Sequence, residues 1–498
     1  MSARGPLFRR LLVANRGEIA LRVMRTAREL GIETVAVYSD ADRNALHVRH
    51  ADVAYHLGPP PPKESYLRGD LLLAAAKAAG CDAVHPGYGF LSENAVFAQA
   101  CEDAGLVFVG PPPAAIGAMG DKVQARKIAD DARVPLVPGL KEDVRDLAAL
   151  KAKADEIGYP VMLKAAAGGG GKGIRIVRAE KDLDEAGRLA RAEAAAAFGD
   201  DRVYLEKFVV EPRHVEIQVM ADRFGDVVSY GERECSVQRR HQKLVEESPC
   251  AVLTPSLRHA MGEAACRLAK AVGYVGAGTV EFLYSRGEFY FLEMNTRLQV
   301  EHPVTEMRYG VDLVEEQLRV AAGERLAPVP EPRGHAIEVR INAEDPDTFF
   351  PALGSVRRLT LPAGPGVRMD AAVYRGLEVT GYYDSMIGKL IVHGADREHA
   401  IARCRRALEE LRLVGVATSV PVALRVLEDP RFVRGEYHTG LLEDMARQPA
   451  PATVELAALA AAVAKFSQVE RKVASVTGTG SSPWKLANRL DILQGRVR

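Results

Sequence analysis

Five polar residues at alternate positions of one short segment have the types and the spacing to bind a charged substrate. Glu, Asn, Arg, Gln and Glu occupy the odd positions of residues 293–301, and Met, Thr, Leu and Val occupy the even ones. Successive side chains of an extended chain point to opposite faces, so all five polar groups would share one face. An amphipathic strand with a solvated face gives the same alternation. A surface strand more often carries Lys, Thr or Ser, and we therefore favour a functional face.

The start of this segment is predicted to belong to a β-hairpin with strands 278–284 and 288–295. A three-residue turn pairs the last residue of the first strand with the first residue of the second. Glu281 and Glu293 are then diagonal neighbours on one face, about 7–8 Å apart at Cα, and a one-residue slip would separate them. Two carboxylates at one place require a cation. Beside phosphate groups, Mg²⁺ fits best, because it binds a few carboxylate oxygens together with phosphates.

The glycine-rich stretch 168–173 lies between two predicted strands, 159–165 and 174–177. A dinucleotide fingerprint needs a helix after the glycines, and a P-loop needs Ser or Thr after Gly-Lys. A protein kinase would also carry His-Arg-Asp and Asp-Phe-Gly motifs, which the chain lacks. The stretch is therefore a hairpin tip flanked by Lys164 and Lys172. Binding of phosphates through its backbone N–H groups is favoured over a merely mobile hairpin.

Residues 232–243 form a charged cluster with a short basic run, bracketed by Glu232, Glu234, Glu246 and Glu247. Because these glutamates balance the short basic run, the cluster does not favour contact with nucleic acid. An anion pocket is the sharper hypothesis, and a solvated charged loop is the alternative.

The composition sets outer limits on the class of protein. With 498 residues and about 150 residues per domain, about three domains are expected. Lys and Arg (66) balance Asp and Glu (66), which disfavours a nucleic-acid partner. The longest apolar run, near residues 456–464, is far shorter than the roughly 18 residues of a membrane span. Six cysteines without a C-x-x-C pair predict neither disulfides nor zinc, and favour a reducing cytoplasm.

The pattern of short apolar runs and helical stretches predicts the elements that position these residues. Strands are expected at 11–14, 34–38, 83–85 and 107–109, and helices at 18–30, 71–79 and 97–104. This alternation predicts a parallel sheet of βαβ units. After a break at Pro111–Pro113, a helix at 121–131 and a smaller α/β unit with helix 183–198 are expected. Further strands are expected at 214–220 and 336–342.

A series of motifs occurs in the order known from one family. They occupy residues 14–20, 85–94, 119–122, 168–173, 211–218, 232–243, 293–302 and 340–345. By these motifs the chain resembles biotin carboxylase of the ATP-grasp superfamily, collinearly over about residues 8–445. The resemblance implies an α/β and α+β architecture. Its domains would be an N-terminal Rossmann-like domain (1–118), an ATP-grasp domain (119–330) with a mobile glycine-rich lid at about 137–210, an α+β C-terminal domain (331–447) and a helical or linker tail (448–498).

The resemblance also implies a role for individual residues. Those for ATP are Lys122, Lys164, Gly168, Gly169, Gly170, Gly171, Glu206, Lys207, Val209, His214, Gln238 and His241. Those for Mg²⁺ or Mn²⁺ are Glu281, Glu293 and Asn295, and those for bicarbonate are Lys243, Arg297, Gln299 and Val300. Tyr88 and Arg340 would bind biotin. The implied catalytic residues are Glu301, Arg340, Arg297 and Lys243. Glu301 would be the general base, and Arg340 would hold the biotin enolate.

The implied reaction is the ATP-dependent carboxylation of biotin by bicarbonate through carboxyphosphate. The chain contains no Met-Lys dipeptide of a biotin acceptor, so biotin would arrive on another chain. The implied partners are a biotin carboxyl carrier protein and carboxyltransferase subunits, in an acetyl-CoA carboxylase of fatty acid biosynthesis or a related acyl-CoA carboxylase, with a homodimer as the assembly. The alternatives are another ATP-grasp carboxylate ligase, the biotin carboxylase subunit of a two-chain pyruvate carboxylase, or a regulatory chain without catalytic activity. Ala165-Ala166-Ala167 before the glycines departs slightly from the family pattern.

Overall fold

The structure is a computed structural model of the 498-residue chain. It describes residues 7–139, 147–165, 174–198, 201, 203–239, 242–447 and 465. The chain divides into two units, Met1–Leu442 and Glu443–Arg498. The glycine loop, His241 and the predicted tail apart from residue 465 lie outside the described residues. Among the described helices, none is long and apolar enough to cross a membrane.

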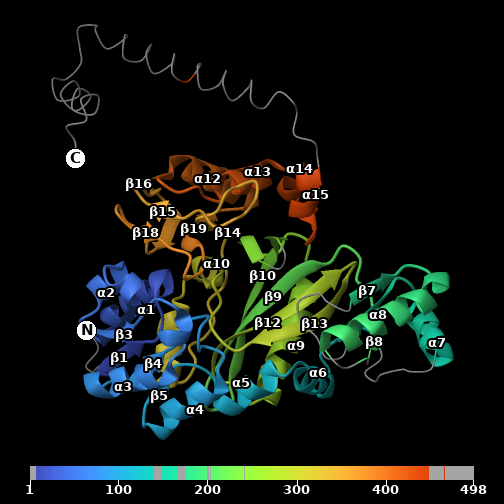
Figure 1. Cartoon of the computed structure of the whole chain (residues 1–498), viewed down its shortest axis with the longest axis horizontal. Coiled ribbons are helices and arrows are strands. Elements are labelled where there is room, and N and C mark those ends of the chain that lie inside the picture. Colours follow the sequence, from blue (N-terminus) through green and yellow to red (C-terminus); the bar gives the residue numbers. More distant parts are fainter. Residues whose placement is uncertain are drawn as a thin grey trace. The chain divides into compact units, whose positions relative to one another are not determined.

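The N-terminal region forms a parallel sheet of five strands in the order β3-β2-β1-β4-β5 (Figure 1). Its strands are β1 (Arg10–Val13), β2 (Glu33–Ser39), β3 (Val53–Gly58), β4 (Ala83–His85) and β5 (Val107–Phe108), with helices α1 (Gly17–Glu29), α2 (Leu46–His50), α3 (Gly69–Ala79) and α4 (Ala95–Asp103). Leu11 and Val13 enter one apolar core and Leu12 enters another, so both faces of β1 are covered. The predicted Rossmann-like arrangement is confirmed. The edge strand β3 was not predicted, because two of its six residues are exposed and His56 interrupts its apolar residues.

A second sheet has eight strands in the order β13-β12-β9-β10-β11-β14-β19-β17. The strands are β9 (Arg213–Ala221), β10 (Val227–Arg239), β11 (Gln242–Ser248), β12 (Gly276–Ser285), β13 (Glu288–Asn295), β14 (His335–Asn342), β17 (Val367–Ala371) and β19 (Met386–Gly394). Helices α5 (Pro113–Gly120), α6 (Lys122–Asp131), α9 (Pro255–Ala271), α10 (His302–Tyr309), α11 (Leu313–Ala321) and α12 (Arg397–Glu410) accompany it. β11 pairs with β14, so the sheet continues across residue 330, where a domain boundary is predicted.

The charged cluster 232–243 lies on β10 and β11 and is almost entirely buried in its described part. The alternative of a solvated loop is therefore wrong for these residues. Strand pairing satisfies the backbone, and the charged side chains pair with one another inside the protein.

The β12–β13 hairpin differs from the predicted register. Arg286 and Gly287 both have positive φ and form a two-residue turn, so Ser285 pairs with Glu288. This turn alone would place Leu292 opposite Glu281. A β-bulge at Leu292 shifts the register by one residue, and Glu281 pairs directly with Glu293 instead of diagonally.

The polar line 293–301 is not one extended strand, and this prediction is wrong. β13 ends at Asn295, residues 296–301 turn, and α10 begins at His302. Its polar side chains consequently reach several different partners.

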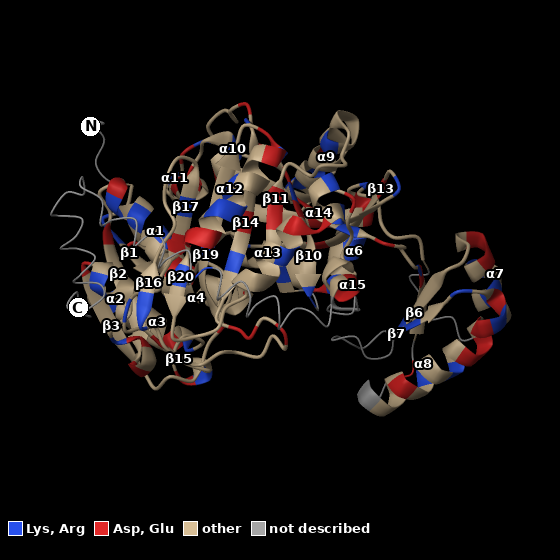
Figure 2. Cartoon of the chain, turned by 90° about the horizontal axis from the view of Figure 1, so that it is seen from above, with Lys and Arg blue, Asp and Glu red and all other residues tan. Residues whose placement is uncertain are grey.

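A separate three-stranded sheet in the order β7-β6-β8 coincides with the predicted lid. It contains β6 (Val161–Ala165), β7 (Ile174–Val177) and β8 (Val203–Lys207), with α7 (Leu147–Ile157) and α8 (Leu183–Phe198). Leu150, Leu163, Val177 and Leu183 are among the residues of its own apolar core. Figure 2 shows that acidic and basic residues are interspersed along α7 and α8.

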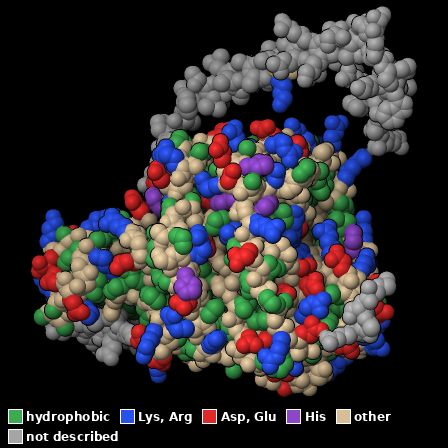
Figure 3. Space-filling model, turned by 180° about the vertical axis from the view of Figure 1, so that it is seen from behind, with side chains coloured by type: hydrophobic (Ala, Val, Ile, Leu, Met, Phe, Trp, Pro, Cys, Tyr) green, Lys and Arg blue, Asp and Glu red, His purple; other side chains and the backbone are tan. Residues whose placement is uncertain are grey.

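The remaining elements follow β14. Short strand pairs join β15 (Gly354–Ser355) to β18 (Glu378–Val379) and β16 (Arg358–Thr360) to β20 (Arg412–Val414), and the last helices are α13 (Val420–Glu428), α14 (Pro430–Arg434) and α15 (Leu441–Arg447). On the face shown in Figure 3, acidic and basic side chains are interspersed, in agreement with the zero net charge.

Glu247 on β11 binds side chains of this C-terminal region. From these contacts we predict that the protein loses stability in acid. Glu247 accepts hydrogen bonds from His335 (2.6 Å), Arg397 (2.8 and 3.0 Å) and Tyr437 (2.5 Å). Burial raises its pKa, but His335 and Arg397 outweigh burial and lower the pKa to about 2. Because the folded pKa lies below the unfolded one, the stabilisation is complete above about pH 4.5 and is lost as the pH falls toward 2. Glu247→Gln is expected to cost on the order of 3 kcal/mol at neutral pH, and less in acid.

Urea unfolding at a series of pH values checks this expectation, with the exposed Glu263→Gln on α9 as the control. A stability difference between wild type and Glu247→Gln that stays constant from neutral pH to about pH 3 would contradict the role of the carboxylate charge.

Candidate active site

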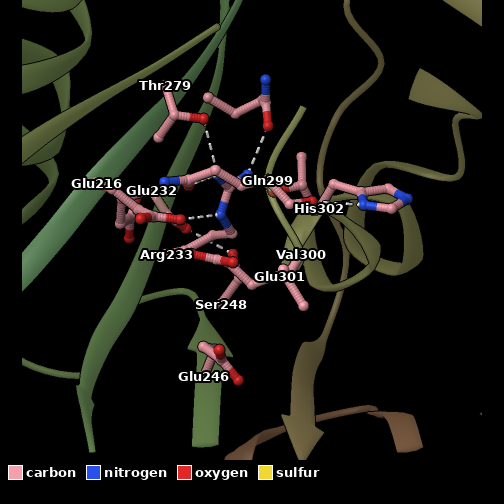
Figure 4. A network of polar contacts seen from close by, with 12 residues as sticks. Glu216, Glu232, Arg233, Glu246, Ser248, Thr279, Gln299, Val300, Glu301 and His302 are labelled. Carbon is pink, nitrogen blue, oxygen red and sulfur yellow. Dashed lines mark hydrogen bonds and ion pairs between the residues drawn. The ribbon is translucent and has the colours of Figure 1, made fainter. Parts of the chain in front are cut away.

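Arg233 on β10 is the centre of a buried polar network (Figure 4). Its side chain is 0% exposed. The guanidinium donates to Glu216, Gln218 (2.6 Å), Thr279 (3.0 Å), Gln299 (2.8 Å) and Thr305 (3.1 Å). These partners come from β9, β12, α10 and the turn before α10. Arg233 therefore fixes Gln299, at the end of the polar line, against the sheet.

Lys243 on β11 gathers three carboxylates. Its Nζ lies 2.7 Å from Glu216, 3.1 Å from Glu281 and 2.6 Å from Glu301. Burial lowers the pKa of Lys243, but Glu216 and Glu301 outweigh burial and hold the pKa well above its usual value. The ammonium group is thus charged and completely paired.

Glu301 lies between two cations. One oxygen accepts from Lys243, and the other accepts from Arg340 at 2.9 Å. Burial raises the pKa of Glu301, yet the charges of Lys243 and Arg340 outweigh burial and hold the pKa well below its usual value. Glu301 is an ionised carboxylate at 2% exposure, available as a proton acceptor.

Arg340 on β14 joins Glu301 to a second pair of carboxyl groups. It donates to Glu246 at 2.6 Å, and Glu246 pairs across the strands with Glu338. Burial raises the pKa of Glu246 to about 7, with Arg340 opposing the shift. Burial also raises the pKa of Glu338 well above its usual value, although Lys389 opposes it. Arg340 therefore adjoins two carboxyl groups, Glu246 and Glu338, whose pKa values are raised.

The residues predicted to bind metal fit a divalent cation. Glu281 and Glu293 are cross-strand partners. Burial and the charge of Glu281 raise the pKa of Glu293, so an added cation would relieve a repulsion between them. The Nδ2 of Asn295 is buried without a hydrogen-bond partner among the described residues, while its Oδ1 accepts from Arg297 at 2.9 Å. Two carboxylates and an amide oxygen suit Mg²⁺ or Mn²⁺.

His214 and Glu216 lie close to this group. Donor atoms of His214, Glu216 and Glu281 are all within 4.8 Å of one another. His214 contacts the second oxygen of Glu281 at 2.9 Å, and Gln299 donates to the first at 2.7 Å. Burial raises the pKa of Glu281, but Lys243 and His214 outweigh burial and lower the pKa below its usual value.

A cavity of about 520 Å³ opens beside Arg340. Tyr88, Arg297 and Val300 also line it. The Arg297 guanidinium donates to Glu93 (3.1 Å) and Asn295, away from the carboxylates around Lys243. The structure therefore places the predicted biotin residues Tyr88 and Arg340 in one cavity with two of the predicted bicarbonate residues.

The residues predicted to bind ATP are placed in several elements. Glu206 on β8 is buried between Lys164 (2.5 Å) and Arg126 (2.7 Å). Lys207 donates to backbone carbonyls of the lid, the nearest at Gly158 (2.7 Å). Lys122 is the first residue of α6, Val209 lies between β8 and β9, and Gln238 pairs with Lys243. Gly168–Gly171 and His241 lie outside the described residues, and their roles stay predictions.

Comparison with known families shows which family the chain belongs to. Residues 7–116 match the biotin carboxylase N-terminal domain, residues 121–329 match the carbamoyl-phosphate synthase L chain ATP-binding domain, and residues 338–444 match the biotin carboxylase C-terminal domain. The chain belongs to the biotin carboxylase family.

Three relatives illustrate the similarity. Biotin carboxylase 1 of Bacillus subtilis is 52% identical, over 88% of this chain and 98% of its own. A pyruvate carboxylase subunit of Methanothermobacter thermautotrophicus is 53% identical, over 89% and 91%. Among solved structures, the biotin carboxylase domain dimer of Hydrogenobacter thermophilus 2-oxoglutarate carboxylase, in complex with MgADP, ADP and bicarbonate, has a TM-score of 0.80. It is 46% identical and covers 89% of this chain and 99% of that one.

Sequence reasoning missed several residues that build this biotin carboxylase site. Glu216 and Arg233 form the central ion pair, and Glu246 pairs with Arg340, but none was assigned a role. A signal for Glu216 exists in the alternation of polar positions 214, 216 and 218 with Val215 and Ile217. Arg233 and Glu246 carry no such signal, because their importance comes from partners on other strands.

Proposed function

We propose that this chain uses ATP and bicarbonate to carboxylate biotin held on a separate carrier protein. The observation that carries the proposal is the position of Glu301. It is ionised between Lys243 and Arg340, and its neighbour Val300 lines the cavity that contains Tyr88. One location thus offers a base for bicarbonate and a cation for the biotin enolate. The similarity to biotin carboxylases supports the same reaction.

Glu301 would accept the proton of bicarbonate as the bicarbonate oxygen attacks the γ-phosphoryl group of ATP. The bond from this phosphorus to the β-phosphate oxygen breaks, and ADP and carboxyphosphate form. Lys243 and Arg297 would hold the bicarbonate, because Arg297 belongs to the turn that carries Gln299 and Val300, and Lys243 contacts Glu301 at the end of the same turn.

The second stage would take place in the cavity beside Arg340. Carboxyphosphate separates into CO₂ and phosphate, and the phosphate takes the N1′ proton of biotin. Arg340 would stabilise the enolate oxygen while biotin N1′ forms a bond to CO₂. The closed lid would keep water from carboxyphosphate, and the glycine hairpin is proposed to form its tip.

A divalent cation held by Glu281, Glu293 and Asn295 would supply positive charge at the nucleotide phosphates. Lys122, Lys164, Glu206 and His214 would orient ATP. Three family matches with breaks near residues 118 and 330 support the proposed division into an N-terminal domain, an ATP-grasp domain with lid, a C-terminal domain and a tail.

One assay separates this function from its alternatives. ADP release from MgATP is measured with and without bicarbonate and free biotin. The proposed enzyme needs bicarbonate and responds to biotin. Turnover that needs neither would favour a different ATP-grasp ligase, and no turnover under any condition would favour a chain without catalytic activity.

The final acceptor and the assembly are part of the proposal. We expect carrier and carboxyltransferase subunits on separate chains, with an acyl-CoA such as acetyl-CoA as acceptor. The relative that belongs to a pyruvate carboxylase supports pyruvate as the second candidate. A relative solved as a dimer supports a homodimer, which light scattering would test. Six unpaired cysteines agree with a reducing cytoplasm.

Lys389→Met is expected to weaken the use of bicarbonate. Lys389 on β19 is completely buried, donates to the Val300 carbonyl oxygen (2.7 Å) and lies 3.3 Å from Glu18. Glu18 accepts from Tyr88, so Lys389 links the bicarbonate side of the site to the biotin side. Without this anchor the turn that carries Glu301 shifts, and we expect the KM for bicarbonate to rise about tenfold while the KM for ATP stays constant.

Lys270→Met on the exposed side of α9 is the matched control. A parallel rise in both KM values would show general structural damage and contradict a positioning role, as would unchanged kinetics.

A further inference from the structure

Three exposed apolar side chains lie on the loop that follows Asn342 and on the loop that contains Tyr382, and Asn342 and Tyr382 both line the 520 Å³ cavity. Phe350 is 73% exposed, Leu353 is 59% exposed and Tyr382 is 50% exposed. We call these three residues the rim patch. Tyr382 also lines the cavity, so the patch is continuous with it.

Backbone contacts hold the two segments of the rim patch side by side. Strand β15, directly after Leu353, pairs with β18, directly before residues 380–382. A Cβ added to Gly381 would lie 3.8 Å from the Leu353 side chain. The backbone of Ala343 forms a hydrogen bond with each segment. Its N–H donates to the Ser385 carbonyl oxygen, and its carbonyl oxygen accepts from the Ala352 N–H. The two loops that carry the rim patch therefore lie side by side, with Leu353 next to Gly381.

The loop that presents Phe350 is well tethered. The side chain of Asp345 accepts from the N–H groups of Asp347 and Thr348, and its N–H donates to the carbonyl of Phe350. The Arg239 guanidinium lies 4.0 Å from the centre of the adjacent Phe349 ring. The fold thus holds a large apolar ring out in solvent beside a substrate cavity. Exposed apolar groups that gather next to a cavity mark interaction sites, whereas single exposed apolar side chains do not.

We propose that the rim patch is the docking surface for the carrier protein that brings biotin into the cavity. The inference rests on the proposed function. A substrate tethered to another protein enters through the cavity mouth, so the body of that protein must meet the rim. Tyr382 belongs to both the cavity wall and the patch, which makes the carrier the occupant that the geometry favours. A second copy of this chain on the patch would cover the mouth and obstruct a tethered substrate.

The test compares two forms of the same substrate. The double variant Phe350→Ser/Leu353→Ser removes exposed side chains and leaves Tyr382 in the cavity wall. Carboxylation is measured with free biotin and with a purified biotinylated carrier protein that the wild type carboxylates. We expect kcat/KM for the carrier to fall at least tenfold and kcat/KM for free biotin to stay within about twofold, because the cavity is unchanged. Phe224→Ser, a ring with 50% exposure elsewhere on the surface, is the control and is expected to change neither value.

Three other results would overturn the docking proposal. Equal losses with both substrates would mean that the loops shape the cavity, and no loss with the carrier would mean that it docks elsewhere. A change in oligomeric mass of the double variant would assign the patch to self-association. Failure of the wild type to carboxylate free biotin would instead contradict the proposed function, which keeps the two failures distinguishable.

Discussion

Glu301→Gln is expected to reduce biotin carboxylation by about 10²- to 10⁴-fold, because an amide cannot accept the bicarbonate proton. The fold should survive the change. Lys243 keeps Glu216 and Glu281 as partners, and Arg340 keeps Glu246. ATP binding should also be retained, because the residues proposed to bind the nucleotide do not depend on this carboxylate. Labelled bicarbonate incorporated into free biotin measures the reaction, and calorimetry measures MgATP binding.

Glu263→Gln on α9 is the control, because it makes the same change from carboxylate to amide at an exposed position. We expect it to leave both measurements unchanged. Activity of Glu301→Gln within about threefold of wild type would show that the proton goes elsewhere. Loss of ATP binding would show that the role assigned to Glu301 is misplaced.

Arg233→Met is expected to lower the free energy of unfolding by about 3–5 kcal/mol, because it leaves the buried Glu216 carboxylate with only one of its two cationic partners, Lys243. Arg233 and Glu216 are both 0% exposed, and Arg233 also satisfies Gln218, Thr279, Gln299 and Thr305. Removal of the guanidinium leaves these oxygens buried without their donor. Urea unfolding monitored by circular dichroism measures the loss.

A second substitution separates charge from packing. In Arg233→Met/Glu216→Gln the buried carboxylate charge that lost Arg233 is gone, and we expect part of the lost stability to return. Arg319→Met removes a partly exposed ion pair with Glu315 on α11, and we expect it to change stability by no more than about 0.5 kcal/mol. A loss below about 1 kcal/mol for Arg233→Met would contradict the central role of this ion pair.

The sequence alone predicted the parallel N-terminal sheet, the acidic hairpin and the family, and these predictions are confirmed. Glu281 and Glu293 are close along the chain, so a local turn brings them to one face. The predicted turn was one residue too long, and the bulge at Leu292 was not foreseen. Both errors concern the register, and together they still leave the two carboxylates as neighbours. The long motifs identified the family because they preserve the order of many residue types.

Only the tertiary structure decided which charges meet. Lys243 and Arg340 reach Glu301 from positions 58 and 39 residues away, on strands from both sides of a predicted domain boundary. The polar line also looked like one face in the sequence, but the strand ends at Asn295 and Arg297 turns toward Glu93. Residue types are local information, whereas ionisation depends on burial and on the nearest opposite charge. The sequence therefore determined which groups are available, and the pairing of β11 with β14 determined that Glu301 is an ionised carboxylate between Lys243 and Arg340.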